Sequence, residues 1–308
     1  MHAVRHCVVS ALLAVVLAGC TTSGPTAGPV DVRAPAAAAS PDVPLPNRSD
    51  SLKFAVLGDF GNGGRAQYQM AAEMARWHKA FPFELVTTVG DNLYGSQGPR
   101  DYERKFETPY KPLIDAGVKF YATLGNHDDL GQRFYALFNM GGRRYYSFRA
   151  PKQNVRFFAL DSGYLVPEQL KWLEGELQGS GEDWKIAYFH HPPYSSGGRH
   201  GSDEVVREAL EPLFVKYNVS VVLTGHDHFY ERIKPQSGIV YFVVGSGGQL
   251  RSGNLNKRST LTARGFDTDR AFMAAEIHGN EMFFNAISRR GAVVDSGVIT
   301  RRGAEKTQ

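Results

Sequence analysis

The stretch Leu52-Lys53-Phe54-Ala55-Val56-Leu57-Gly58-Asp59-Phe60 is a short apolar run that ends in a glycine and an acidic residue. Such a run predicts a buried β-strand followed by a tight turn, because glycine lets the chain turn directly off the strand. Residues 85–92 show the same pattern as Leu-Val-Thr-Thr-Val-Gly-Asp-Asn. The two stretches therefore predict two strands that each end at an aspartate.

Similar apolar runs follow along the chain, and segments rich in helix-forming residues separate them. Further strands are expected within 118–129, 155–162, 184–192, 219–228 and 239–248, helices at 64–80, 101–116, 167–178 and 203–217, and hairpin-like strands after residue 272. Strands that alternate with helices predict an α/β fold built in layers.

Polar residues of one chemical kind stand at the ends of five of these predicted strands. They are Gly58-Asp59, Gly90-Asp91-Asn92, Gly125-Asn126-His127-Asp128, His190-His191 and Gly225-His226-Asp227-His228. In α/β sheets, ligands bind beyond the carboxyl ends of the strands, so the fold is expected to gather these side chains in one place. Carboxylate, amide and imidazole donors suit metal ions such as Zn, Fe and Mn. The joint occurrence predicts a metal site rather than five independent turns.

These five blocks, in this order, resemble the calcineurin-like metallophosphoesterases, and more narrowly the purple acid phosphatases. The family's blocks read Gly-Asp-x-Gly, Gly-Asp-x-x-Tyr, Gly-Asn-His, a strand-borne His and Gly-His-x-His, and the matching residues span 58–228. The resemblance implies a layered sandwich of two mixed β-sheets flanked by helices. It also implies a metal-dependent phosphoric ester hydrolase with a pair of metal ions.

The resemblance further assigns the metal ligands. It implies Fe(III) at Asp59, Tyr94 and His228, a divalent Fe, Zn or Mn ion at Asn126, His190 and His226, and Asp91 as a bridge between the two ions. Most relatives carry a histidine two residues after the first aspartate, where this chain has Gly61. We expect Tyr94 to replace that ligand, since a phenolate is a hard donor suited to Fe(III). The alternative is that Tyr94 is a packing aromatic residue in a loop.

Two further histidines are expected to take part in proton transfer. His127 follows Asn126 and should face the substrate, where it binds a phosphate oxygen or protonates the leaving group. His200 lies in the Gly/Ser-rich loop 195–201, at a distance along the chain from His190 that resembles purple acid phosphatases but is one residue longer than in short animal-type members. The alternative for His200 is a solvated loop residue.

His191 neighbours a predicted ligand, but its position on a strand leaves two readings open. Successive residues of a strand point to opposite faces, so His191 either joins the site or points away from it. Residues 249–271 are polar and rich in turn residues. They form either a loop over the site, in which Arg251, Lys257, Arg258 or Arg264 meets a phosphorylated substrate, or solvated surface.

The expected reaction is the hydrolysis of phosphate monoesters by a metal-bound hydroxide, without a phosphoenzyme. Two metal ions lower the pKa of a bound water molecule and hold a phosphate for in-line attack. A phosphodiesterase or nucleotidase that uses the same site is the alternative, because the ligands do not encode the leaving group. A non-catalytic surface lipoprotein is a third reading, which the intact ligand set argues against.

The only two cysteines of the chain, Cys7 and Cys20, lie near its N-terminus. This excludes a disulfide scaffold and a metal site built from four thiolates. The apolar run 8–18 is too short to span a bilayer but has the length of a signal-peptide core. Leu17-Ala18-Gly19-Cys20 resembles a bacterial lipoprotein signal, which predicts that residues 1–19 are removed and that Cys20 is lipidated. An ordinary signal peptide with a chance cysteine is the alternative.

Composition and charge bound the rest of the chain. We expect a disordered Pro/Ala-rich linker at 20–50, a catalytic domain at 51–300 and a C-terminal tail at 301–308. The signal predicts an extracytoplasmic protein that is lipid-anchored, at the outer membrane or in the periplasm, and by resemblance to bacterial lipoproteins Thr21, in place of an acidic residue after Cys20, implies the outer membrane. Of the 308 residues 42% are hydrophobic, which excludes wholesale disorder. The net charge of +4, without a dense block of Lys and Arg, predicts no nucleic-acid partner. The oligomeric state stays open.

Overall fold

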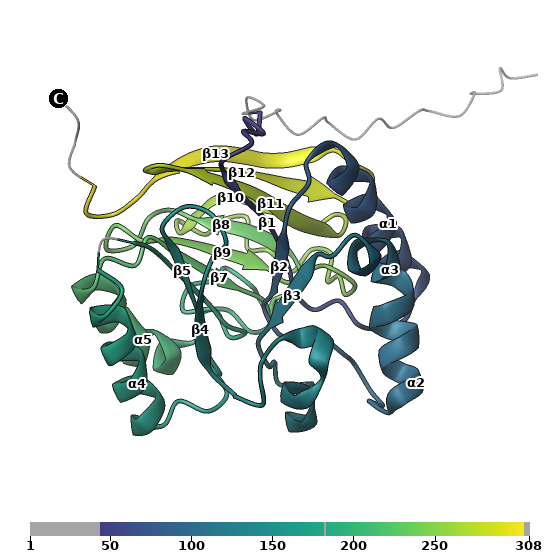
Figure 1. Cartoon of the computed structure of the whole chain (residues 1–308), viewed down its shortest axis with the longest axis horizontal. Coiled ribbons are helices and arrows are strands. Elements are labelled where there is room, and N and C mark those ends of the chain that lie inside the picture. Colours follow the sequence, from purple (N-terminus) through teal and green to yellow (C-terminus); the bar gives the residue numbers. More distant parts are fainter. Residues whose placement is uncertain (1–43, 182, 305–308) are drawn as a thin grey trace, which may run out of the picture. The chain divides into compact units, whose positions relative to one another are not determined.

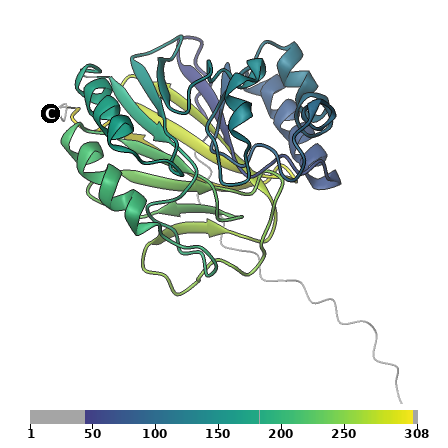
Figure 2. The ribbon, with the colours of Figure 1, turned by 90° about the horizontal axis from the view of Figure 1, so that it is seen from below.

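The computed structural model describes residues 44–181 and 183–304 (Figure 1). The predicted signal peptide, Cys20, most of the predicted linker and the end of the tail lie outside these residues. Two β-sheets face each other, and helices flank them (Figures 1 and 2). This confirms the predicted sandwich of two mixed sheets.

Each sheet combines parallel and antiparallel strands. The first sheet has the spatial order β13 (Val293–Thr300), β12 (Glu281–Ser288), β11 (Ala271–His278), β1 (Leu52–Leu57), β2 (Leu85–Thr88) and β3 (Lys119–Ala122). The second has the order β10 (Thr262–Phe266), β8 (Tyr230–Ile233), β9 (Val240–Val244), β7 (Val221–Thr224), β6 (Trp184–Tyr188), β5 (Val155–Ala159) and β4 (Tyr146–Arg149). Strands β1, β2 and β3 run parallel in the first sheet, as do β5, β6, β7 and β9 in the second.

The main hydrophobic core fills the space between the sheets. Phe54 on β1 meets Phe157 on β5 edge to face, with ring centroids 5.3 Å apart, and Phe242 on β9 meets Phe284 on β12 at 5.1 Å. All six residues of β1 are buried, because one face of this strand meets the second sheet and the other meets the helices. Burial on both faces explains why β1 reads as a nearly continuous apolar run.

Helices complete the layers on the outer faces. The helical elements are α1 (Arg65–Ala80), α2 (Pro99–Tyr102), a π-helical turn (Glu103–Glu107), α3 (Thr108–Asp115), two 3-10 turns (Leu130–Phe134 and Ala136–Phe138), α4 (Pro167–Gln178) and α5 (Glu204–Lys216). Helices α4 and α5 pack on the second sheet, where Leu173 and Leu210 share a second hydrophobic core with Phe158 (Figure 2). Within the described residues, no helix is both long enough and apolar enough to cross a bilayer.

The structure adds three strands that the sequence did not predict, β4, β8 and β10. Strand β10 lies inside 249–271, the segment expected to be a polar loop, and it pairs with β8 at the edge of the second sheet. The last residues of the predicted linker contact the domain just ahead of its predicted start at Ser51. The backbone N–H groups of Asn47 and Arg48 donate to the carboxylate of Glu276, at 2.5 and 2.7 Å, so the last residues of the predicted linker lie against β11.

Backbone hydrogen bonds join the carboxyl ends of strands from both sheets. The N–H of Asp59 donates to the carbonyl of Gly90 at 3.0 Å, which ties the turn after β1 to the turn after β2. The N–H of Gly247, after β9, donates to the carbonyl of Gly58 at 2.9 Å. The polar residues that follow these strands are therefore delivered to one place, as the sequence predicts.

Candidate metal centre

The turns that follow β1, β2 and β7 hold three non-glycine residues in left-handed backbone conformations. Asp59, Asp91 and His226 have φ values of +53°, +51° and +70°. Such conformations cost about 1–3 kcal/mol each and cluster at functional sites. The preceding glycines make room for the carboxylates: a Cβ atom on Gly225 would lie 2.4 Å from Oδ2 of Asp59. The local backbone is therefore shaped around the aspartate side chains.

Four side chains converge on one point at the end of β1 and β2. The phenol oxygen of Tyr94 lies 2.8 Å from Oδ2 of Asp91, 3.2 Å from Oδ1 of Asp59 and 3.3 Å from Nε2 of His228. Donor atoms that surround one metal ion at about 2.0–2.2 Å are separated by roughly this distance. Tyr94 thus points into the site with the aspartates and does not pack away from it.

A second group of donors lies on the other side of Asp91. Nε2 of His190 is 3.0 Å from Oδ1 of Asn126 and 3.1 Å from Nδ1 of His226. It is also 3.5 Å from Oδ1 of Asp91. Asp91 therefore directs Oδ2 to the group around Tyr94 and Oδ1 to the group around His190, as a carboxylate that bridges two ions would.

The charges at the site fit bound cations. Asp59 and Asp91 are 0% and 1% exposed, and within residues 44–181 and 183–304 neither forms an ion pair with Lys or Arg. Burial, and next the charge of Asp91, raise the pKa of Asp59 well above its ordinary value. Two adjacent buried carboxylates without a cation are costly, and a metal ion between them removes that cost.

The histidines are in the neutral form that metal binding requires. Burial lowers the pKa of His190 and of His228 to about 4, and burial together with the neighbouring His190 lowers that of His226 to about 2. Nδ1 of His190 lies 3.0 Å from the carbonyl oxygen of Val89, so it carries the proton and leaves the lone pair on Nε2. These imidazoles offer lone pairs at neutral pH.

The two histidines predicted to transfer protons lie at the rim of this centre. His127 is exposed, and the centroid of its ring is 4.8 Å from that of the Tyr94 ring. Its backbone N–H donates to Oδ1 of Asp91 at 2.9 Å. His200 is also exposed, and the centroid of its ring lies 4.1 Å from that of the His226 ring. His191 joins the site and does not point away, because its ring lies 4.6 Å from that of His226 while its Nδ1 meets Oγ of Ser162 at 2.9 Å.

Asp128 stands in one of the motifs but has no role predicted from the sequence. Its carboxylate accepts hydrogen bonds from the backbone N–H groups of Asn92, Leu93 and Gly125, at 2.9–3.0 Å. It thereby fixes the turn that carries Asp91 and Tyr94 against the turn that carries Asn126. Burial, and next the charge of Asp91, raise the pKa of Asp128 to about 7.

Two more buried charges hold loops of the site in place. Asp227 accepts from Oγ of Ser195 at 2.6 Å and from the N–H of Gly201 at 3.1 Å, which positions the loop that carries His200. Lys105, in the π-helical turn, donates to the carbonyl of Tyr94 at 2.7 Å and to that of Ser96 at 2.5 Å. Asp227 stands in one of the motifs, whereas Lys105 lies outside all of them and depends on backbone carbonyls that approach it only in the folded chain.

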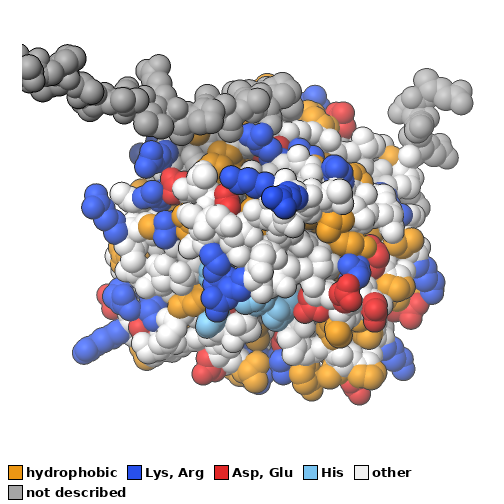
Figure 3. Space-filling view, turned by 180° about the vertical axis from the view of Figure 1, so that it is seen from behind, with side chains coloured by type: hydrophobic (Ala, Val, Ile, Leu, Met, Phe, Trp, Pro, Cys, Tyr) orange, Lys and Arg blue, Asp and Glu red, His pale blue; other side chains and the backbone are white. Residues whose placement is uncertain are grey.

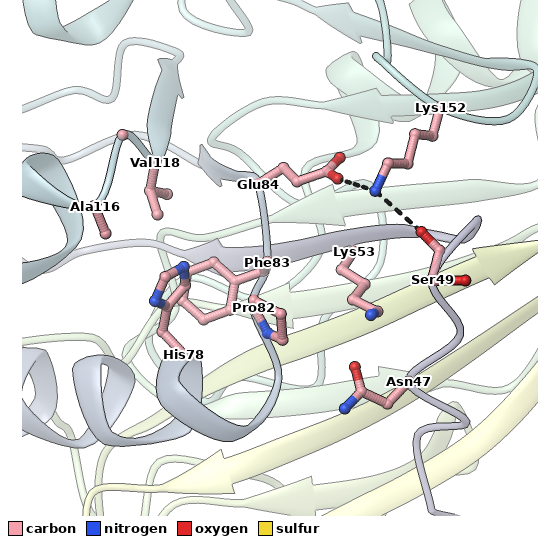
Figure 4. Close-up of a pocket in the computed structure, with 11 residues that line it drawn as sticks. Asn47, Ser49, Lys53, His78, Pro82, Phe83, Glu84, Ala116, Val118 and Lys152 are labelled. Carbon is pink, nitrogen blue, oxygen red and sulfur yellow. Dashed lines mark hydrogen bonds and ion pairs between the residues drawn. The ribbon is translucent and has the colours of Figure 1, made fainter.

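A cavity lies elsewhere, at the amino-terminal ends of β1, β2 and β3. It measures about 630 Å³, and its lining includes Lys53, His78, Phe83 and Lys152 (Figure 4). Within the described residues, the groups of His and Asp side chains that could hold a metal ion both lie at the opposite ends of the strands. The cavity in Figure 4 is therefore separate from the candidate metal centre.

Comparison with known proteins agrees with this geometry. Human tartrate-resistant acid phosphatase type 5 is 26% identical over 311 residues, which cover 84% of this chain and 95% of that protein. The Fe(3+)-Zn(2+) purple acid phosphatase 12 of Arabidopsis thaliana is 29% identical over 234 residues, 66% of this chain and 46% of that protein.

Solved structures share the fold. The purple acid phosphatase PPD1 of yellow lupin (Lupinus luteus) has a TM-score of 0.68 at 20% identity, over 84% of this chain and 55% of that one. GAP50, the anchor in the inner membrane complex of Plasmodium, has a TM-score of 0.73 at 19% identity, over 83% of this chain and 90% of that one. Residues 52–230, which carry every turn of the site, match the calcineurin-like phosphoesterase family. The chain therefore belongs to the calcineurin-like phosphoesterase family.

Proposed function

We propose that this metal-dependent phosphoric ester hydrolase cleaves phosphate monoesters in the manner of a purple acid phosphatase. One observation carries the proposal: the carboxylate of Asp91 stands between two donor groups, with one oxygen directed to each. The purple and tartrate-resistant acid phosphatases among the relatives support the same reaction. The fold alone does not decide it, since a protein described as an anchor shares the fold.

The residues at the centre divide into two sets of ligands. Fe(III) would be held by Asp59, Tyr94 and His228, a divalent Fe, Zn or Mn ion by Asn126, His190 and His226, and both ions by Asp91. When bound, the two ions would supply Lewis acidity toward the phosphate and lower the pKa of a water molecule. A phenol beside two carboxylates is a hard donor set, which supports Fe(III) in the first position. The Fe(3+)-Zn(2+) relative in Arabidopsis supports the mixed pair.

The chain's own residues would bind the phosphate and move the proton. His127 and His200 are exposed and lie on opposite sides of the centre, one against Tyr94 and the other against His226. Either imidazole can donate a hydrogen bond to a phosphate oxygen. In our proposal, one of them also gives its proton to the leaving alcohol as the bond between phosphorus and the ester oxygen breaks. Asp227 would keep the His200 loop in reach.

The proposed location of the enzyme is extracytoplasmic, with the lipidated Cys20 as its membrane anchor. The support is the sequence alone: a short apolar run followed by Leu-Ala-Gly-Cys. Radiolabelled palmitate incorporation and membrane fractionation of the full chain test it. Cys20→Ser should lose the label and release the protein from the membrane fraction. Retention of the label by that variant would contradict lipidation at Cys20.

Metal analysis combined with a substrate panel tests the reaction. The purified full chain should contain two metal ions and should hydrolyse p-nitrophenyl phosphate faster than bis(p-nitrophenyl) phosphate. A higher kcat/KM for the diester would favour the alternative phosphodiesterase. A protein that holds two ions and hydrolyses neither ester would favour a non-catalytic surface protein.

A further inference from the structure

Two arginines border the candidate metal centre from neighbouring loops. Arg199 immediately precedes His200, and the backbone N–H of Arg251 donates to the carbonyl of His228 at 3.0 Å. The two loops are joined, because the N–H of Gly198 donates to the carbonyl of Asn254 at 2.8 Å. In Figure 3, side chains of Lys and Arg lie directly beside the group of histidines. The backbone of both arginines is thus attached to the loops that carry His200 and His228.

The positive charge of these arginines reaches the histidines. After burial, Arg251 is the largest cause that lowers the pKa of His228, and Arg199 contributes in the same direction. Both arginines also lower the pKa of His200. The other cations of the segment 249–271 lie differently: Arg264 donates to the carbonyl of Val294 at 2.8 Å, and Lys257 is exposed. The structure thereby separates Arg251 from Lys257 and Arg264, three of the four cations that the sequence left undecided.

Neither arginine has a partner for its charge among the described residues. Within the part of the chain that the structure describes, no carboxylate forms an ion pair with Arg199 or Arg251. Nη1 of Arg251 is buried and makes no hydrogen bond. A buried donor without a partner is destabilising, and more so when it is charged, so the site is better satisfied with an anion bound. A guanidinium group also has the planar fork that pairs with phosphate and carboxylate through two hydrogen bonds.

We propose that Arg199 and Arg251 form an anion subsite, which binds a second phosphoryl or carboxylate group of the substrate while the first phosphate occupies the metal centre. The inference rests on the proposed function. It narrows the substrate class to phosphate esters that carry a second anionic group. The reacting phosphate would lie among the metal ligands, His127 and His200. Arg199 is exposed and is the neighbour of His200 in the sequence, so a second group of the same substrate would meet it beside His200.

Three substrates with alcohol leaving groups test the subsite on the metal-loaded full chain. Glycerol 3-phosphate carries no second anion, 3-phosphoglycerate carries a carboxylate, and 1,3-propanediol bisphosphate carries a second phosphate. We expect kcat/KM for at least one of the two esters with a second anionic group to be about tenfold or more higher than for glycerol 3-phosphate. This is the effect of one or two charge-assisted hydrogen bonds. The two esters separate carboxylate from phosphate as the preferred second group.

Variants assign the preference to the arginines. The preference is measured as the kcat/KM of the preferred ester with a second anionic group divided by that of glycerol 3-phosphate. Arg251→Gln and Arg199→Gln should each lower this ratio, and the double variant should bring it near one. Arg251→Lys, which keeps the charge and loses the fork, should restore part of the ratio. Lys257→Gln removes one exposed charge from the same segment and should keep the wild-type ratio.

A binding measurement provides a readout independent of turnover. 3-Phosphonopropionate and propylphosphonate cannot be hydrolysed and differ mainly by one carboxylate. Calorimetry should give a Kd about tenfold lower for 3-phosphonopropionate in the wild type, and nearly equal Kd values in Arg251→Gln. Two results would overturn the subsite and leave the proposed function standing. One is a wild type that hydrolyses glycerol 3-phosphate with a kcat/KM ratio near one, and the other is a double variant that keeps the wild-type ratio. Absence of hydrolysis of all three esters would overturn the proposed function itself.

Discussion

The phenol oxygen of Tyr94 lies 2.8 Å from Oδ2 of Asp91, which precedes it by three residues in the same turn. One turn after β2 therefore delivers both the carboxylate that stands between the two donor groups and the phenol that completes the first group. This arrangement offsets Gly61, which provides no side chain where most relatives are expected to carry a histidine. A Cβ atom on Gly61 would lie 1.8 Å from the carbonyl oxygen of Asn92, so a larger residue there would displace this turn.

Replacement of Tyr94 by Phe should abolish the visible charge-transfer absorption of the iron-loaded protein, because that absorption requires a phenolate bound to Fe(III). The measurement is an absorption spectrum of the purified protein with its metal content. Tyr68→Phe is the matched control, since the Tyr68 phenol binds the carbonyl of Arg104 on the surface. A band that persists in Tyr94→Phe, or a colourless wild type that holds two zinc ions, would contradict the iron assignment.

Replacement of Asp128 by Asn should weaken metal binding and activity by about 10–100-fold, the usual cost of removing a group that orients metal ligands. The carboxamide loses acceptor capacity for the three backbone N–H groups that hold the turns of Asp91 and Asn126 together. Metal titration and kcat/KM measure the effect. Asp115→Asn, at an exposed ion pair with Lys111, should change neither. Equal behaviour of the two variants would show that Asp128 does not position the centre.

The protein should lose stability below about pH 6.5 partly through His78, which lines the cavity in Figure 4. Burial lowers the pKa of His78 in the folded chain. As the pH falls from 7 to 5, the unfolded chain therefore binds a proton that the folded chain resists, and the free energy of unfolding decreases.

Urea unfolding of the wild type and of His78→Gln at pH 7 and pH 5 measures this contribution. The difference in unfolding free energy, wild type minus variant, should decrease toward pH 5. The pH dependence of the distant metal centre cancels in that difference. A difference that stays constant or increases toward pH 5 would exclude a lowered pKa at His78.

The sequence predicts the buried parallel strands well, because their apolar runs are continuous. It does not predict β4, β8 and β10, because these strands have only four or five residues, include polar side chains and lie at or near the edge of a sheet. The motif residues of the metal centre are predictable, since each stands at the end of a strong strand. The turn that Asp128 holds is not, because it depends on loops that meet only after folding.

The role of Asp91 as the shared residue of two metal sites is the central claim, and Asp91→Ala tests it most directly. Metal content per chain and kcat on p-nitrophenyl phosphate are measured together for the full chain, with Asp115→Ala as the exposed control. The wild type and the control should hold two ions. Asp91→Ala should hold at most one ion and lose kcat by about 10³-fold or more, since a two-metal site supplies several kcal/mol to the transition state. Two bound ions and near-normal activity in Asp91→Ala would contradict the account.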